Sequence, residues 1–150
     1  MIKDVKITTR RIIPDDRGKI MHIMKSSDAE FDAFGEVYCS TVYPGVVKGW
    51  HMHKLMTLNY VVLKGNIKFV LYDGRADSPT YKELQELIIG ENNYVMVTVP
   101  PFVWNGFKGI GLEEAIVINY TDIPHDSNEI VRMDPHENNL IDYDWSVKDR

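Results

Sequence analysis

The chain has 150 residues, of which 44% are hydrophobic, and this suits a single domain over residues 1–150 with a packed core. Its 17 basic and 22 acidic side chains give a net charge of 17 − 22 = −5, which argues against a surface for nucleic acid or anionic membranes. No apolar run reaches the length of a signal peptide or a membrane span, so we expect a cytoplasmic protein. The single cysteine, Cys39, excludes an internal disulfide and a cysteine-based zinc site.

Short apolar or alternating runs, separated by Gly, Pro, Asn and Asp, dominate the sequence and predict β-strands. In chain order the expected strands are residues 6–13, 19–24, 35–43, 56–63, 67–72, 84–89, 94–99, 104–108 and 115–120. Only residues 26–34 read as a helix, with Ser26 or Ser27 as its cap. So many short strands predict an all-β fold, either an antiparallel barrel or a two-sheet jelly roll, whose interior can hold a ligand.

Two histidines after the turn at Pro44-Gly45 are the main candidates for chemistry. His51 and His53 are two residues apart, so on a strand their side chains face the same side. If that side is the interior, two imidazoles project into the pocket, where a group that titrates near neutral pH suits proton abstraction beside a carbonyl. The same pair can also lie on the surface without a function.

The spacing Gly45-x5-His51-x-His53-x4-Leu58-x6-Gly65 resembles the first motif of the cupin superfamily, and residues 100–107 resemble the second. In metal-binding cupins a glutamate stands at the position of Leu58 and a histidine at that of Asn105. Divalent transition metals usually take three or four N, O or S ligands. We therefore expect no metal and no other cofactor, although two histidines can still hold a metal weakly.

More specifically, the chain resembles the dTDP-4-dehydrorhamnose 3,5-epimerase family, a metal-independent branch of the cupins. Five segments carry the likeness in the same order as in the family: residues 16–18, 48–51, 73–80, 100–107 and 146–149. The resemblance implies a cupin-type jelly-roll barrel. It also implies that His51 is a catalytic base oriented by Asp149, because a bonded carboxylate fixes the tautomer and stabilises the imidazolium. Taken alone, Asp149 would be read as a solvated residue near the chain end.

Several family positions differ in this chain. Leu58 replaces the family's lysine near the enolate oxygen, and Ile116 or Val117 replaces its tyrosine acid. Asn105 replaces the histidine of the second motif. Lys48 replaces the arginine that contacts the nucleotide, and His22 replaces an early glutamate. Loss of the lysine removes a cation that would stabilise an enolate, at a cost on the order of 10²–10³ in rate unless another donor substitutes. Candidate substitutes are His53, Asn105, Tyr60 and Lys48.

Tyr60 has the same strand parity as Leu58, so it can line the cavity and act as an acid, or simply pack in the barrel. Trp50 and Trp104 can stack on a base or sugar, or belong to the core. The run His51-Met52-His53-Lys54 also resembles the dTDP-4-keto-6-deoxyglucose 3,4-ketoisomerases, in which both histidines lie in the active site.

Together, the residues and the resemblance predict an epimerase that acts on a nucleotide-linked 4-keto-6-deoxy sugar by proton abstraction at C3 and/or C5. With the family tyrosine missing, we expect action at one carbon rather than two. Substrate contacts are expected from Arg17, His22, Lys48, His53, Asn105 and Trp104, with Arg17 and Lys48 at the diphosphate. In the family the residue at Arg17 reaches the neighbouring subunit's site, which implies a homodimer. The alternatives are a 3,4-ketoisomerase, a non-catalytic sugar-nucleotide binder and a metal-dependent cupin.

Overall fold

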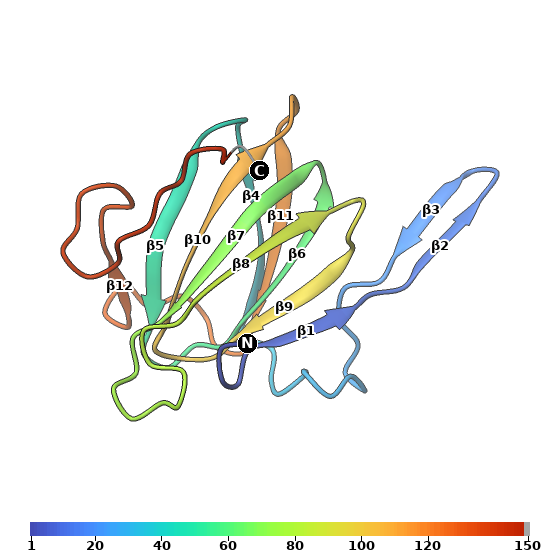
Figure 1. The fold of residues 1–150 in the computed structure, drawn as a ribbon. Helices are drawn as coiled ribbons and strands as arrows, with labels where there is room; N and C mark the ends of the chain where they lie inside the picture. Colours follow the sequence, from blue (N-terminus) through green and yellow to red (C-terminus); the bar gives the residue numbers. More distant parts are fainter. Residues whose placement is uncertain (149–150) are drawn as a thin grey trace.

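A computed structural model describes residues 1–148, and these residues form strands and turns without a helix (Figure 1). None of the described segments is a helix that could cross a membrane. In chain order the strands are β1 (Lys6–Thr9), β2 (Ile12–Asp15), β3 (Gly18–Met21), β4 (Glu36–Val42), β5 (Val47–His53), β6 (Leu58–Lys64), β7 (Asn66–Asp73), β8 (Leu84–Gly90), β9 (Val95–Val99), β10 (Val103–Ile110), β11 (Ala115–Thr121) and β12 (Ile130–Arg132).

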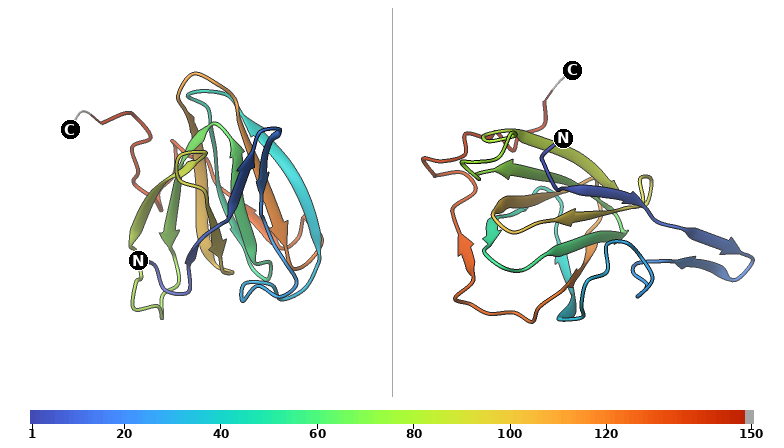
Figure 2. Two further views of the ribbon diagram at one scale, coloured as in Figure 1. Left: turned by 90° about the vertical axis from the view of Figure 1, so that its right-hand side faces the viewer. Right: turned by 90° about the horizontal axis from the view of Figure 1, so that it is seen from below.

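The strands form two five-stranded antiparallel sheets, in the orders β1-β9-β6-β11-β4 and β12-β5-β10-β7-β8. Strands β2 and β3 pair only with each other and project from the body as a hairpin (Figures 1 and 2). The prediction of an all-β fold built from antiparallel strands is confirmed. Strands β5 and β12 are additions to the expected set, and the expected strand 6–13 is divided between β1 and β2.

The main core lies between the two sheets and follows the alternation of side chains along each strand. On β7, Ile67, Phe69 and Leu71 join this core, whereas Val70 and Tyr72 belong to a second cluster on the outer face. That outer cluster is closed by Ile141 and Trp145 from the C-terminal segment. Both faces of β7 are therefore buried, which explains why residues 67–72 are a nearly continuous apolar run.

The predicted helix at residues 26–34 is wrong, because this segment is a series of turns. Two acidic side chains of the segment, Asp28 and Glu30, instead hold it against the end of β1. Asp28 accepts a hydrogen bond from the Lys25 backbone N–H at 2.9 Å and pairs with Arg10 at 2.8 Å. Glu30 accepts from Thr8 at 2.8 Å and pairs with Arg10 at 3.2 Å. These long-range contacts override the local helix signal.

Candidate active site

A pocket of about 480 Å³ lies between the two sheets, within the usual size range of small-molecule sites. One wall comes from β5 and the adjacent β12, and the opposite wall comes from β4, β6 and β11. The segment between β11 and β12 contributes His125. Segments that are far apart in the sequence therefore meet at one cavity, as expected for a jelly roll that holds a ligand between its sheets.

Strand β5 brings both predicted histidines to the pocket. His51 and His53 line it, while Trp50 and Met52 on the same strand pack into the outer cluster. The shared orientation that the two-residue spacing predicts is thus what the fold shows. Strand β5 lies unusually close to β10, since a Cβ on Gly49 would be 2.9 Å from the Cα of Gly106.

The environment of His51 favours a neutral imidazole. Burial, and then the nearby charges of Arg132, His53 and Lys48, lower the pKa of His51 to about 4. The ring therefore has a free lone pair at neutral pH and can accept a proton. Its expected partner Asp149 lies outside the described residues, so the proposed pairing of this carboxylate with His51 stays a prediction.

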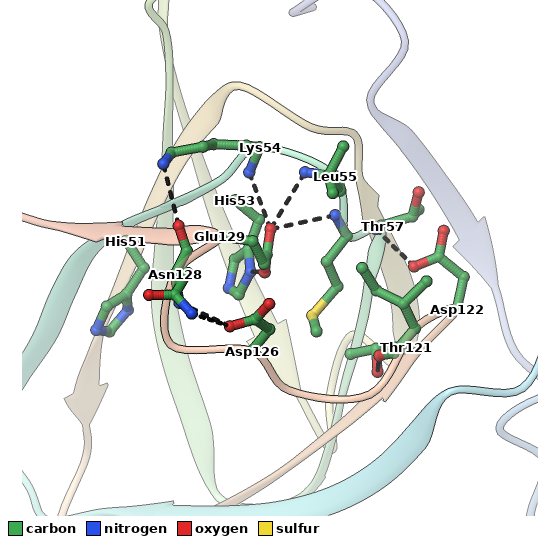
Figure 3. A network of polar contacts seen from close by, with 12 residues as sticks. His51, His53, Lys54, Leu55, Thr57, Thr121, Asp122, Asp126, Asn128 and Glu129 are labelled. Atoms are coloured by element: carbon green, nitrogen blue, oxygen red, sulfur yellow. Dashed lines mark hydrogen bonds and ion pairs between the residues drawn. The ribbon is translucent and has the colours of Figure 1, made fainter.

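His53 has a carboxylate partner that the sequence analysis missed. Its Nδ1 bonds to Oε1 of Glu129, and both side chains are buried (Figure 3). The other oxygen of Glu129 accepts backbone N–H groups of Lys54, Leu55 and Met56 at 3.0, 3.1 and 3.4 Å. Burial acts to raise the pKa of Glu129, but the hydrogen bonds from His53 and from the backbone together lower it. The carboxylate is thus ionised and fixes the orientation of the His53 ring.

Tyr60 and Asn105 form a second polar group beside His51. The Tyr60 hydroxyl donates to Oδ1 of Asn105 at 3.4 Å, and Nδ2 of Asn105 donates to the backbone oxygen of His51 at 3.2 Å. Burial, and then the neighbouring Tyr38, raise the pKa of Tyr60 well above its ordinary value. Tyr60 lines the pocket, while Leu58, which shares its parity, lies in the core between the sheets.

Lys48 and Arg132 place positive charge at the pocket. Nζ of Lys48 donates to Oγ of Ser40 at 2.9 Å across the cavity, and Arg132 projects from β12, where it pairs with His51 in the strand register. Cationic side chains of this kind suit phosphate oxygens. Arg132 was not predicted, because nothing in residues 130–132 signals a strand that pairs with β5.

Three predicted substrate contacts lie away from this pocket. Arg17 is on the projecting hairpin, 89% exposed, and pairs with Asp15. His22 follows the same hairpin, and its backbone oxygen accepts a hydrogen bond from Tyr94. Trp104 packs in the outer cluster, because it neighbours Asn105 on β10 and so faces the opposite side. The fold thus brings together His51, His53, Tyr60, Asn105 and Lys48, but not these three.

The segment 73–80, one of the five that carry the family likeness, does not line the pocket. It forms a turn that is held together by hydrogen bonds to Asp73. Asp73 is fully buried and accepts hydrogen bonds from Arg75 at 2.8 Å and from the hydroxyls of Ser78 and Thr80, each at 2.6 Å. Burial acts to raise the pKa of Asp73, but these hydrogen bonds lower it overall. Among residues 1–148, no group of three or more His, Cys, Asp or Glu side chains is placed to hold a metal ion.

Comparison with known proteins identifies the family. The family profile described as dTDP-4-dehydrorhamnose 3,5-epimerase matches residues 1–150. A probable low-salt glycan biosynthesis epimerase, Agl13 of Haloferax volcanii, is 35% identical over 150 residues, covering 98% of this chain and 96% of its own. The spore coat polysaccharide biosynthesis protein SpsL of Bacillus subtilis is 27% identical over the full length of both chains.

Solved structures show the same relationship. The dTDP sugar isomerase from Desulfovibrio desulfuricans G20 is 39% identical with a TM-score of 0.88, covering 90% of this chain and 87% of its own. The dTDP-4-dehydrorhamnose 3,5-epimerase of Bacillus anthracis, solved with TDP and pyrophosphate bound, is 25% identical with a TM-score of 0.80, covering 89% and 81%. The predicted jelly-roll fold and isomerase class are confirmed, whereas the likeness of the histidine pair to the 3,4-ketoisomerases stays a prediction. The chain belongs to the dTDP-4-dehydrorhamnose 3,5-epimerase family of sugar-nucleotide epimerases.

Proposed function

We propose that the chain inverts C3 and/or C5 of a nucleotide-linked 4-keto-6-deoxy sugar in the pocket around His51. The carbonyl at C4 acidifies the C–H bonds on both neighbouring carbons, so a positioned base is the first requirement. One observation carries the proposal: a neutral imidazole lines a sugar-sized cavity that also presents Lys48 and Arg132. A base and cations in one cavity suit a keto sugar joined to a diphosphate.

In the first step His51 removes the proton, and the electron pair of the C–H bond moves to the carbonyl oxygen as an enolate. Asp149 is the expected carboxylate behind the imidazolium that forms. Burial, and then the cations near His51, hold its pKa low in the free protein. A bound diphosphate would offset the charges of Lys48 and Arg132 and so strengthen the base when substrate is present.

His53 is the best placed substitute for the family lysine that Leu58 replaces. Glu129 accepts from Nδ1 of His53, so in the imidazolium form the other ring nitrogen, on the pocket side, carries a proton that it can donate to the enolate oxygen. Asn105 supports this wall through its hydrogen bond to the backbone oxygen of His51. Tyr60 also lines the pocket, but its raised pKa makes it a weak acid, so its proposed part is to hold Asn105 in place through the hydrogen bond from its hydroxyl.

Arg17 and His22 are proposed to serve a partner subunit. Both belong to the projecting hairpin region and lie away from their own pocket, which supports an arrangement in which the hairpin reaches a second copy. The homodimer and the cytoplasmic location are parts of this proposal. Sedimentation of the wild type and of Arg17→Ala, with dTDP titrations of each, tests it; a monomeric wild type would end it.

Two alternatives remain as rivals. A 3,4-ketoisomerase is favoured by the presence of both His51 and His53 at one pocket. A non-catalytic sugar-nucleotide binder is favoured by Leu58 and by the missing family tyrosine. Relatives named for glycan and spore coat polysaccharide biosynthesis support a product destined for a polysaccharide.

The test is incubation of the protein with dTDP-4-keto-6-deoxyglucose and its GDP counterpart in deuterated water, followed by NMR. An epimerase gives deuterium at C3 or C5 together with an inverted centre, at one carbon if the expectation from the missing tyrosine holds. A ketoisomerase moves the carbonyl to C3. Tight binding with no exchange supports the binder and contradicts the proposed epimerase, and stoichiometric metal in the purified protein would contradict the metal-free mechanism.

A further inference from the structure

Tyr38 lies on the wall of the pocket opposite His51. It belongs to β4, an edge strand of the sheet β1-β9-β6-β11-β4, whereas His51 belongs to β5 in the other sheet. Both side chains line the same cavity. Inversion of a carbon needs a proton removed from one face and a proton delivered to the other, so groups on opposite walls are what the reaction requires.

The Tyr38 hydroxyl is oriented by a buried amide. Nδ2 of Asn119 donates to the Tyr38 oxygen at 2.8 Å. The amide cannot be flipped, because its Oδ1 accepts the backbone N–H of Asn59 at 3.0 Å. An amide nitrogen only donates, so the phenol oxygen accepts this bond and keeps its own proton, which remains available to donate. A donor at the oxygen also stabilises the phenolate that remains after the proton leaves.

Tyr60 is placed differently from Tyr38. Its side chain is only 5% exposed, compared with 41% for Tyr38. It packs against Phe69 and Phe107 in the core, with ring centroids 5.1 and 6.3 Å apart. Its hydroxyl donates to Asn105. Both tyrosines line the pocket, but the Tyr60 hydroxyl is buried and already bonded to Asn105, so Tyr38 is the tyrosine more open to a substrate.

We propose that Tyr38 is the acid that protonates the enolate carbon on the face opposite His51, and this role rests on the proposed function. The enolate electron pair re-forms the C4 carbonyl, the carbon takes the proton of the Tyr38 hydroxyl, and a phenolate stabilised by Asn119 remains. Solvent then reprotonates the phenolate while His51 releases the proton it took. Protons balance over the cycle, and no oxidant, reductant or cofactor is consumed.

The test compares Tyr38→Phe with the wild type on dTDP-4-keto-6-deoxyglucose in deuterated water, following exchange and inversion separately. In the variant His51 still removes the proton and returns deuterium to the same face. We expect exchange within about tenfold of the wild type but a loss of inverted product of about 10²-fold or more, the usual contribution of a positioned acid. Tyr43→Phe is the matched control, because Tyr43 is 67% exposed and does not line the pocket; it should change neither rate.

Three outcomes overturn the proposal. Inversion by Tyr38→Phe within about threefold of the wild-type rate would show that another group is the acid. Loss of exchange together with inversion, in a variant that still binds dTDP and unfolds at the wild-type temperature, would assign Tyr38 to the first half-reaction instead. If the wild-type protein neither exchanges nor inverts the dTDP- and GDP-linked 4-keto sugars, the proposed function itself fails. This outcome is seen without any variant, so it is distinguishable from a failure of the Tyr38 role alone.

Discussion

Glu129→Ala is expected to destabilise the protein strongly, because one carboxylate satisfies four donors. It bonds Nδ1 of His53 and three successive backbone N–H groups, those of Lys54, Leu55 and Met56. Removing one partner of a buried charged pair typically costs about 3–5 kcal/mol, since the remaining groups lose their partners without access to water. In a domain of this size that corresponds to a fall in Tm of roughly 6–20 °C.

Glu129→Gln separates the hydrogen bonds from the charge. Its amide oxygen can still accept backbone N–H groups, so we expect a loss of only about 1–2 kcal/mol. The amide nitrogen of the new side chain then faces Nδ1 of His53, so this ring nitrogen must give up its proton and become the acceptor. Urea unfolding measures the stability, and nitrogen NMR of the imidazole reports the tautomer.

The control is Glu137→Ala, because Glu137 is exposed on the loop after β12 and should change stability by less than about 0.5 kcal/mol. The lowered pKa of Glu129 also gives a pH dependence. Its contribution is complete above the ordinary carboxyl pKa and is lost as the pH falls through the lowered value. A Glu129→Ala protein as stable as Glu137→Ala at pH 7 would refute the reasoning.

Three further predictions concern His51 and the cations beside it. The folded-state pKa of His51 is about 4, below its ordinary 6.5, so the free energy of unfolding is highest above pH 6.5 and falls toward pH 4. The expected fall is roughly 2 kcal/mol after solvent screening. Urea unfolding at both pH values should show a smaller fall in His51→Asn than in the wild type. Binding of dTDP should raise the His51 pKa, measured by imidazole NMR, and an unchanged pKa would contradict a diphosphate beside Lys48 and Arg132. Lys48→Ala and Arg132→Ala should each weaken dTDP binding about tenfold by calorimetry at low salt, and Lys6→Ala, exposed on β1, should not.

The pocket-facing residues of β5 and β6 could be predicted because their signals are local. A two-residue spacing fixes which side chains share a face of a strand, so His51 and His53 follow from parity alone, and Tyr60 follows from the parity of Leu58. The same rule separates Trp104 from Asn105, which are adjacent on β10 and face opposite sides. Trp104 and Asn105 therefore cannot both face the pocket, and the prediction that both contact the substrate conflicts with the alternation of side chains along a strand.

The groups that complete the pocket could not be predicted because they arrive through tertiary structure. Glu129 is 76 residues from His53, and Tyr38 reaches the cavity from the edge of the other sheet. Strand β12 has only three residues and pairs with β5, which lies far before it in the sequence. The residues around Arg132 therefore give no local sign that it reaches the pocket. The failed helix at residues 26–34 has the same cause, because Arg10 on the far side of the hairpin draws Asp28 and Glu30 away from a helical turn.

The central claim is that the imidazole of His51 takes the proton, and chemical rescue tests it most directly. His51→Ala should lower deuterium exchange into dTDP-4-keto-6-deoxyglucose by about 10²–10⁴-fold, and added imidazole should restore part of it by filling the vacated space as a free base. His53→Ala should slow exchange without rescue, since its proposed role is donation to the enolate oxygen. Wild-type exchange in His51→Ala, or rescue of His53→Ala alone, would contradict the account.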